Sequence, residues 1–349
     1  MNPKLETRNP IGVGIVGLGY MAATHLKAYR HLDGYRVAAL CNPSGRNLDG
    51  DFSSVAGNIG PAEPLRLDMT RVKPYRNFAD LLGDSAVQLV DICSPTHTHP
   101  ELAIAALEAG KHVLCEKPLA RTSKLARQIA EAAARAKTSL MPAMCLRFWP
   151  EWAWVKKVID QQTYGKVLGA RFRRVAQPPA WGQKFFFDGD LSGGALLDLH
   201  IHDTDFVQFC FGRPRSVFST GFSKVSGAID HVVTQYQVGC GATVNAEGSW
   251  AMTEGFGFNM SCTVIFENAT ADYDGARGTD ALKLYEKGRE PQTLRFEGKD
   301  GYVGELQYLL ECIGSGRPPS VVTASEGVSA IEICEAEERS VKSGQIVSL

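Results

Sequence analysis

Three polar residues in one short segment have the types and the spacing of a proton-transfer site. Asp198 and His202 are four positions apart, and Asp205 follows three positions later. In a helix these positions share one face, so their side chains form a polar stripe along an otherwise apolar segment. A histidine titrates near neutrality, which suits His202 to act as a general base. Asp198 would orient the imidazole and stabilise its charged form.

A lysine elsewhere in the chain complements this pair. Lys117 would act as a fixed cationic donor that bonds a substrate oxygen and stabilises the negative charge developing there. A base for the hydroxyl proton and a cation on the oxygen are what oxidation of a carbinol carbon requires. The alternative interpretation is that Asp198 and His202 form an ordinary helix salt bridge, with Lys117 exposed elsewhere.

A glycine-rich turn near the N-terminus predicts the partner in such an oxidation. Gly17-Leu-Gly-Tyr-Met-Ala22 follows a predicted strand and opens a predicted helix, which is the context of the dinucleotide fingerprint. Gly17 permits the tight turn, and Gly19 lets the backbone approach a pyrophosphate. The helix N-terminus at Tyr20 and Met21 supplies N–H donors and positive potential. The competing interpretation is an ordinary glycine-rich turn between a strand and a helix.

The residues expected at the ribose leave two cofactors open. The second predicted strand ends at Cys41-Asn-Pro-Ser44, where an acidic residue is usual. Asn42 can bond a ribose hydroxyl but lacks the charge that would repel a 2′-phosphate, and Ser44 and Arg46 could reach such a phosphate. The cofactor is therefore expected to be NAD or NADP, with a slight preference for NADP.

Three longer motifs go beyond a generic fingerprint. They are Cys93-Ser-Pro-Thr-His-Thr-His99, Ala109-Gly-Lys-His-Val-Leu-Cys-Glu-Lys-Pro118 and Gly193-Gly-Ala-Leu-Leu-Asp-Leu-His-Ile-His-Asp-Thr-Asp205. Together they resemble the glucose–fructose oxidoreductase and inositol dehydrogenase family (Gfo/Idh/MocA), over nearly the whole chain. The third motif looks most like the inositol dehydrogenase-type members. The resemblance implies an NAD(P)-dependent oxidoreductase that transfers a hydride between nicotinamide and a carbinol or keto carbon of a sugar, sugar acid or cyclitol.

The resemblance also assigns roles to individual residues. It places the catalytic lysine at Lys117 and the aspartate and histidine of the third motif at Asp198 and His202. The positions that it places along the cofactor are Ser94, Pro95, Thr96, His99 and Glu116, and Lys117 itself is also expected to contact the cofactor. The chain departs from the usual pattern at three places: Asn42 replaces an acid, His200 stands where a small residue is common, and the insertion Asp49–Pro74 is longer than usual. The first departure bears on the cofactor, and the other two bear on the substrate.

Candidate substrate contacts come from four side chains. Arg147 and Trp149 follow the last strand predicted for the first domain, and Trp181 lies in a loop before the third motif. Aromatic faces pack on the C–H surfaces of sugars, and arginine can form two hydrogen bonds to a carboxylate. Asp205 completes the set. For each of them the alternative is a structural role.

Hydrophobic patterning predicts two domains. Residues 1–147 alternate apolar runs with helical patterns, which indicates an α/β Rossmann domain with a doubly wound parallel sheet. Residues 148–349 predict an α+β substrate-binding and oligomerisation domain with a large, mainly antiparallel sheet, and Asp49–Pro74 reads as a surface loop. The expected strands are 11–16, 36–41, 87–93, 112–115 and 139–145 in the first domain, and 167–175, 217–222, 231–238, 242–250 and 259–267 in the second; the expected helices are 21–32, 78–82, 102–109, 122–137, 305–313 and 325–343.

Composition narrows the class of protein further. The formal net charge is −1, from 37 basic and 38 acidic residues, so neither nucleic acid nor a membrane is an expected partner. The nine cysteines include no Cys-x-x-Cys pair, and with no signal peptide or apolar span the pattern predicts free thiols in the cytoplasm. A sheet with one open apolar face favours a homodimer or homotetramer.

Three other functions fit parts of the sequence. The pairs His97/His99 and His200/His202 could serve a metal-dependent hydrolase or isomerase, but the glycine-rich loop and the Glu-Lys-Pro run would then have no role. A dinucleotide-binding sensor would not need Lys117, Asp198 and His202 together. Glycosidase-type chemistry with recycled NAD uses the same residues, and net NAD(P)H production separates it from dehydrogenation. No metal is expected.

Overall fold

The computed structural model describes residues 10–55, 64–296, 298 and 300–349. The chain divides into two compact units, one built from residues 1–119, 127–145 and 301–325 and the other from residues 120–126, 146–300 and 326–349. This division differs from a single cut after residue 147. The difference arises because helix α9 (Gly301–Ser315), near the C-terminus, packs against helix α1 (Tyr20–Tyr29) of the first unit.

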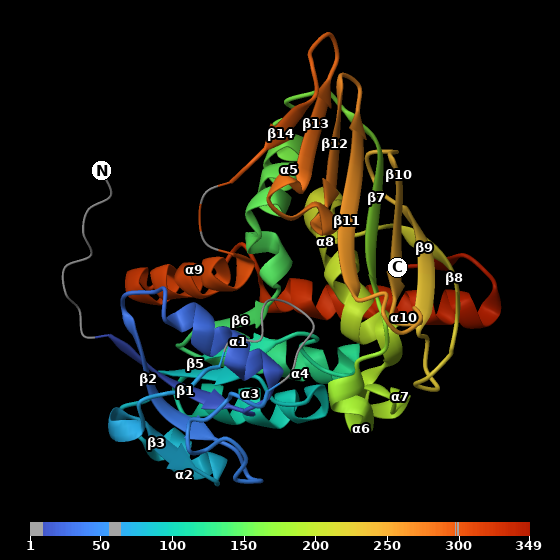
Figure 1. Ribbon diagram of the computed structural model, residues 1–349. Coiled ribbons are helices and arrows are strands. Elements are labelled where there is room, and N and C mark those ends of the chain that lie inside the picture. Colours follow the sequence, from blue (N-terminus) through green and yellow to red (C-terminus); the bar gives the residue numbers. More distant parts are fainter. Residues whose placement is uncertain (1–9, 56–63, 297, 299) are drawn as a thin grey trace. The chain divides into compact units, whose positions relative to one another are not determined.

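The first unit is built on a six-stranded sheet whose strands are all parallel. Its order is β3-β2-β1-β4-β5-β6, the Rossmann order, with the topological switch between β1 and β4. In Figure 1, α1 and α9 lie on one side of this sheet and α3 (His99–Glu108) on the other. The strands are β1 (Ile11–Val16), β2 (Tyr35–Cys41), β3 (Lys73–Tyr75), β4 (Leu89–Ile92), β5 (His112–Glu116) and β6 (Leu140–Ala143), and the remaining helices are α2 (Phe78–Gly83) and α4 (Ser123–Arg135), which contributes to both units.

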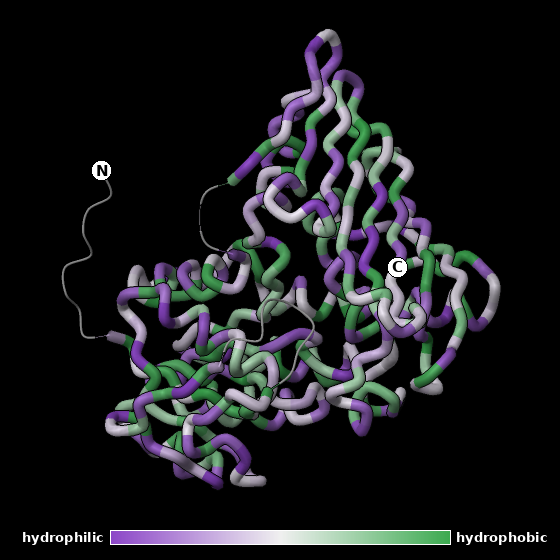
Figure 2. Tube along the Cα trace, viewed as in Figure 1, coloured by the Kyte–Doolittle hydropathy of each residue, from purple (hydrophilic) through white to green (hydrophobic). Residues whose placement is uncertain are grey.

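The sequence predicts these strands well because each is an apolar run buried on both faces. Four of them are fully buried or nearly so along their length, as parallel strands covered by helices must be. The same runs are coloured as hydrophobic in Figure 2. The predicted Rossmann fold is therefore confirmed.

The insertion Asp49–Pro74 holds more structure than the predicted surface loop. Phe52 and Leu65 are buried, and a bridge joins Asp51 to Arg66. The insertion leads into β3, which pairs with β2 at the edge of the sheet. A three-residue strand with a central proline gives no detectable alternation, so the sequence did not predict β3. Residues 56–63 of the insertion lie outside the described part of the chain.

The second unit is built on a nine-stranded, mainly antiparallel sheet. Its order is β14-β13-β12-β11-β7-β10-β9-β8-β15, and only the pair of β7 and β10 is parallel among the described strands. The predicted class is confirmed, with four strands (β12 to β15) that the sequence did not predict. The bounds are β7 (Val167–Ala176), β8 (Ser216–Phe222), β9 (His231–Gln237), β10 (Thr243–Ser249), β11 (Phe258–Phe266), β12 (Ala269–Asp274), β13 (Leu282–Glu286), β14 (Gln292–Leu294) and β15 (Val347–Ser348).

Among the described elements, three helices cover one face of this sheet, and the opposite face carries exposed apolar side chains such as Leu168 and Ile265. Helices α5 (Pro150–Asp160), α8 (Ile201–Phe211) and α10 (Ala324–Ser343) share one buried core with the strands. Trp152 of α5 lies at its centre, with its ring 4.9 Å from that of Phe206 and 5.5 Å from that of Tyr273. Figure 1 shows these helices on the same side of the sheet. The short helices α6 (Gln183–Phe186) and α7 (Gly189–Ser192) precede α8.

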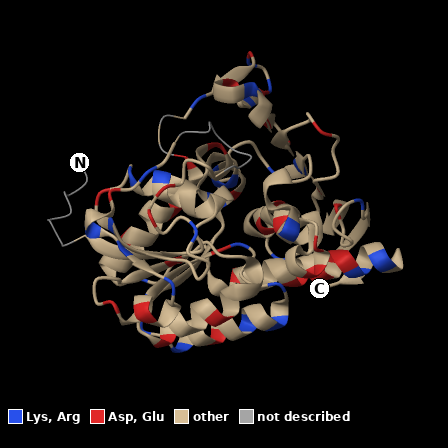
Figure 3. Ribbon diagram, turned by 60° about the horizontal axis from the view of Figure 1, so that its bottom comes forward, with Lys and Arg blue, Asp and Glu red and all other residues tan. Residues whose placement is uncertain are grey.

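The surface shows no strong bias of charge. In the view of Figure 3, basic and acidic residues are interspersed over the ribbon, in keeping with the net charge of −1. Among the described residues, no helix is both long and apolar enough to cross a lipid bilayer. All nine cysteines are free thiols, and only Cys240 is exposed.

Candidate functional site

The glycine-rich turn has the geometry that a dinucleotide pyrophosphate requires. Gly17 adopts a φ of +84°, and a Cβ at this position would collide with the backbone of Ser94. Gly19 is the N-cap of α1, and no described atom lies within 4 Å of the place where its Cβ would be. No side chain caps the first turn of α1. Open space next to the positive end of a helix suits a phosphate, so these residues fit the predicted cofactor.

The turn after β2 presents amide, hydroxyl and guanidinium groups. Asn42 Oδ1 accepts hydrogen bonds from the N–H and the hydroxyl of Ser44 (3.3 and 3.0 Å), and its Nδ2 donates to the carbonyl of Arg46 (2.8 Å). Arg76 also lies against this turn, because a Cβ on Gly45 would be 2.5 Å from its Nη2. The sequence did not indicate Arg76, because this residue follows β3, a strand that was not predicted. The carbonyl oxygen of Tyr75 in β3 accepts a hydrogen bond from the Asn42 N–H.

The loop after β4 is tied down by its own side chains. Ser94 Oγ lies 2.6 Å from Thr98 Oγ1, and Thr98 donates to the carbonyl of Pro95 (2.8 Å). His99 is buried, with Nε2 2.8 Å from the Ser94 carbonyl oxygen and Nδ1 2.9 Å from that of Pro118. Both ring nitrogens therefore lie against backbone carbonyl oxygens, and burial lowers the pKa of the ring. His99 thus links the loop after β4 to the loop after β5, and its place along the cofactor stays a prediction.

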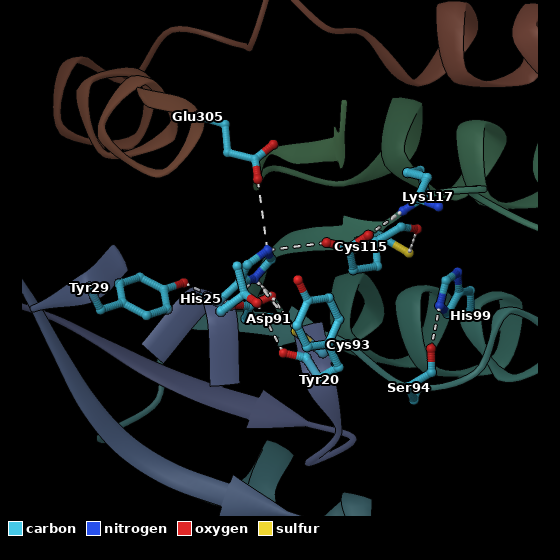
Figure 4. Close-up of polar contacts among 12 residues, drawn as sticks. Tyr20, His25, Tyr29, Asp91, Cys93, Ser94, His99, Cys115, Lys117 and Glu305 are labelled. Carbon is cyan, nitrogen blue, oxygen red and sulfur yellow. Dashed lines mark hydrogen bonds and ion pairs between the residues drawn. The ribbon is translucent and has the colours of Figure 1, made fainter. Parts of the chain in front are cut away.

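Glu116 is also used inside the protein. It ends β5, is buried, and accepts the Lys117 N–H at Oε2 (3.1 Å), while its Oε1 lies 3.1 Å from His25 Nε2. Its carboxylate thus contacts both His25 and the backbone of Lys117, and its place along the cofactor stays a prediction. Lys117 itself is partly exposed, and Figure 4 shows it where β5 ends. Lys117 follows directly after β5, at the carboxyl edge of the parallel sheet, where ligands bind in this fold.

In the second unit, Asp198 and His202 lie at a change of helix type. Residues Leu196–His200 form a π-helical turn, and α8 continues from Ile201. Single π turns inside helices occur frequently at functional sites. Asp198 and His202 are partly exposed, whereas His200, Asp203 and Asp205 between and after them are buried. The segment therefore offers to solvent the two side chains predicted to be catalytic.

Arg147 and Asp205, predicted to contact the substrate, are engaged with each other. The guanidinium donates two hydrogen bonds to Asp205 (2.8 and 2.6 Å) and a third to Glu326 (2.9 Å). It also lies 4.4 Å from the ring centre of Phe209. A buried bidentate pair of this kind is broken only at high cost, which favours the structural alternative for both residues.

The two tryptophans differ in exposure. Trp149 is the N-cap of α5 and packs against the large core, which favours its structural alternative. Trp181 remains 39% exposed, and its ring makes a T-shaped contact with Phe186 at 6.1 Å. Trp181 is therefore the predicted substrate residue whose surface the second unit leaves most accessible.

The His-x-His pairs are not arranged as metal ligands. His200 is buried, with Nε2 3.1 Å from the hydroxyl of Tyr236 and 3.5 Å from Glu337, and it packs so closely on Gly248 that a Cβ there would collide with it. His99 has both nitrogens against carbonyls, as described above. Each pair thus has one buried histidine with at least one ring nitrogen against a partner inside the protein, which does not favour a metal-dependent hydrolase.

Comparison with known proteins identifies the class. Residues 11–144 match an oxidoreductase family with an NAD-binding Rossmann fold, and residues 152–272 match the GFO/IDH/MocA C-terminal domain. The chain therefore belongs to the Gfo/Idh/MocA family of oxidoreductases, as its motifs predicted.

Particular relatives match over nearly their whole length. The chain is 26% identical to a myo-inositol 2-dehydrogenase of Thermotoga maritima, with 97% of this chain and 98% of the relative aligned. It is 25% identical to a scyllo-inositol 2-dehydrogenase (NAD(+)) of Bacillus subtilis, with 96% and 95% aligned. Among solved structures, levoglucosan dehydrogenase in complex with NADH superposes with a TM-score of 0.83 at 20% identity, over 97% of this chain and 99% of that one, and shows the same fold.

Proposed function

We propose that the protein is an NAD(P)-dependent dehydrogenase that oxidises a secondary alcohol of a cyclitol or sugar. The observation that carries this proposal is the full-length similarity to inositol 2-dehydrogenases in a chain that has Lys117, Asp198 and His202 in the family's motifs. The first unit would bind the cofactor, and the second would bind the substrate and form the oligomer. The free thiols are typical of a reducing compartment, so we place the enzyme in the cytoplasm.

The proposed chemistry removes a proton and a hydride from one carbinol. When bound, the oxidised nicotinamide supplies the acceptor for the hydride. His202 accepts the proton from the substrate hydroxyl, and Asp198 stabilises the imidazolium that results. Lys117 donates a hydrogen bond to the substrate oxygen and stabilises its negative charge as the C–H bond breaks and the carbonyl forms.

A screen of cyclitols and sugars with each oxidised cofactor tests the proposal. We expect net formation of reduced nicotinamide with at least one cyclitol or sugar, together with the matching ketone. Net reduction of the cofactor distinguishes the two chemistries. A glycosidase that recycles its cofactor would cleave a glycoside without net formation of reduced nicotinamide. Cofactor binding without turnover of any alcohol in the screen would contradict the proposal and favour a sensor.

NADP is the cofactor we propose, and Arg76 provides the test. Residues 42–46 contain no acidic side chain. Arg46 is part of this turn, and the guanidinium group of Arg76 lies against Gly45. We expect kcat/KM to be higher with NADP, and Arg76→Ala to lower it about 10- to 100-fold, since charge-assisted hydrogen bonds contribute roughly 1.5–3 kcal/mol. Activity with NAD should hardly change. Arg71→Ala, an exposed arginine before β3, is the control. A preference for NAD that Arg76→Ala leaves intact would contradict this assignment.

The open face of the nine-stranded sheet is the surface we propose for a homodimer or homotetramer. Leu168 (53% exposed) and Ile265 (48% exposed) lie next to each other there, around a shallow hollow lined by β7, β10 and β11. We expect the wild type to be oligomeric and Ile265→Glu to shift it towards monomer in light scattering, because a charge on a buried apolar interface is costly. Ile346→Glu, in the turn before β15, should leave the mass unchanged. A monomeric wild type would contradict the proposal.

A further inference from the structure

A buried histidine in the first unit contacts carboxyl groups from three other elements. His25 of α1 has Nδ1 2.9 Å from Oδ2 of Asp91 on β4. Its Nε2 lies 3.1 Å from Oε1 of Glu116 at the end of β5, and 3.7 Å from Oε1 of Glu305 on α9. All four side chains are buried, and Figure 4 shows Asp91 and Glu305 on different sides of the ring. The chemistry proposed above uses none of these contacts.

The surroundings of His25 favour the charged form of its imidazole. A ring with a carboxylate near each nitrogen satisfies both only when both nitrogens carry a proton. Burial lowers the pKa of His25, but Asp91 raises it, and the pKa lies well above its ordinary value. The Tyr29 hydroxyl donates to Asp91 (3.0 Å), and the Tyr302 ring lies 6.3 Å from that of His25. The imidazolium therefore offsets negative charge that the protein interior would otherwise hold uncompensated.

Glu116 connects this cluster to the backbone of Lys117. One oxygen of Glu116 lies against His25 Nε2, and the other accepts the Lys117 N–H at 3.1 Å. We propose that His25 is a positioning residue for Lys117: its imidazolium holds the Glu116 carboxylate, which fixes the backbone from which the Lys117 side chain projects. The inference rests on the proposed function, in which Lys117 acts on the substrate oxygen.

The same neighbourhood contains donor types that bind metals. Ligand atoms of His25, Asp91 and Cys93 all lie within 4.8 Å of one another. The Cys93 sulfur lies 3.4 Å from Oδ1 of Asp91, and burial raises the pKa of this thiol, which keeps its proton. A metal would need the thiolate and an unprotonated ring nitrogen. The contacts are thus a hydrogen bond at Nδ1 and ion-pair contacts at Nε2 of an imidazolium.

Two substitutions interrupt the proposed series of contacts from His25 through Glu116 to Lys117, and a third substitution serves as the control. His25→Gln removes the imidazolium, and Glu116→Gln keeps the shape of the side chain but removes its charge. In both, we expect faster amide hydrogen exchange in a peptide spanning residues 112–119. We also expect kcat to fall about 10- to 100-fold, the scale of a small misplacement of a catalytic group, while the Kd of the reduced cofactor changes far less. Tyr29→Phe removes a hydrogen bond on the Asp91 side of the cluster and should leave the exchange at 112–119 and kcat unchanged.

Three outcomes would overturn the proposal. Equal acceleration of exchange in residues 11–16 and 112–119 would make His25 a general stabiliser of the sheet. A further loss of kcat when His25→Gln is added to Lys117→Ala would show that it does not act through Lys117. A stoichiometric metal ion bound to the wild type and lost in His25→Gln would make the cluster a metal site. Glu116→Gln decides the question if His25→Gln does not fold, and the exchange data decide it even if the wild type oxidises no alcohol.

Discussion

Alanine in place of Lys117 is expected to abolish most turnover while the reduced cofactor still binds. The substitution removes the cation that would stabilise the substrate oxygen, and loss of one such preorganised donor lowers kcat by about 10²- to 10³-fold. The glycine-rich turn and helix α1, which suit the pyrophosphate, are unaffected. Steady-state kinetics would give kcat, and quenching of protein fluorescence by the reduced cofactor would give its Kd.

The control for this variant is Lys124→Ala, an exposed lysine on α4. It removes the same charge from the chain without touching β5 or the glycine-rich turn. Full activity in Lys117→Ala would remove the proposed mechanism. Loss of cofactor binding together with turnover would assign Lys117 to the cofactor site instead of the chemistry.

The elements of this fold could be predicted from the sequence because their signals are local. Buried parallel strands are continuous apolar runs, and Gly17 is required by a turn formed within a few residues of it. Asp198 and His202 were likewise found by their spacing within one segment, and the structure leaves both partly exposed. Local signals thus account for the longer buried strands and most of the longer helices, but not for α5 or for strands β3 and β12 to β15.

The roles of buried polar residues could not be predicted, because their partners are distant in the chain. Arg147 meets Asp205 58 positions away and Glu326 179 positions away. His99 reaches Pro118 across 19 positions. In the sequence, a charged residue that faces a ligand cannot be distinguished from one that faces a buried partner. The sequence therefore could not indicate which of these candidate residues have buried partners inside the protein.

Packing between elements that are distant in the sequence could not be predicted for a related reason. Helix α9 was predicted, but its packing on α1 was not, and Glu305 therefore had no predicted relation to His25. The short strand β3 brings Arg76 to the turn at Gly45 in the same way. Amphipathic patterning shows that a helix or strand has a buried face, but it does not identify the element that covers it.

Asp198 and His202 are expected to act as one unit, so their substitutions should not add. We expect His202→Ala to lower kcat about 10²- to 10⁴-fold, the usual range for a general base. Asp198→Asn should lower it less, and the double variant should be about as slow as His202→Ala alone, because an orienting carboxylate has no effect once the imidazole is gone.

The matched control is His31→Ala, which removes an exposed histidine of the first unit and should keep full activity. Imidazole added to His202→Ala should restore part of the rate if the missing group is a base, and should do nothing for Lys117→Ala. Additive losses in the double variant would separate the two residues into independent roles. Undiminished turnover in His202→Ala would mean that the hydroxyl proton leaves by another route, and the assignment of Asp198 as its orienting partner would fall with it.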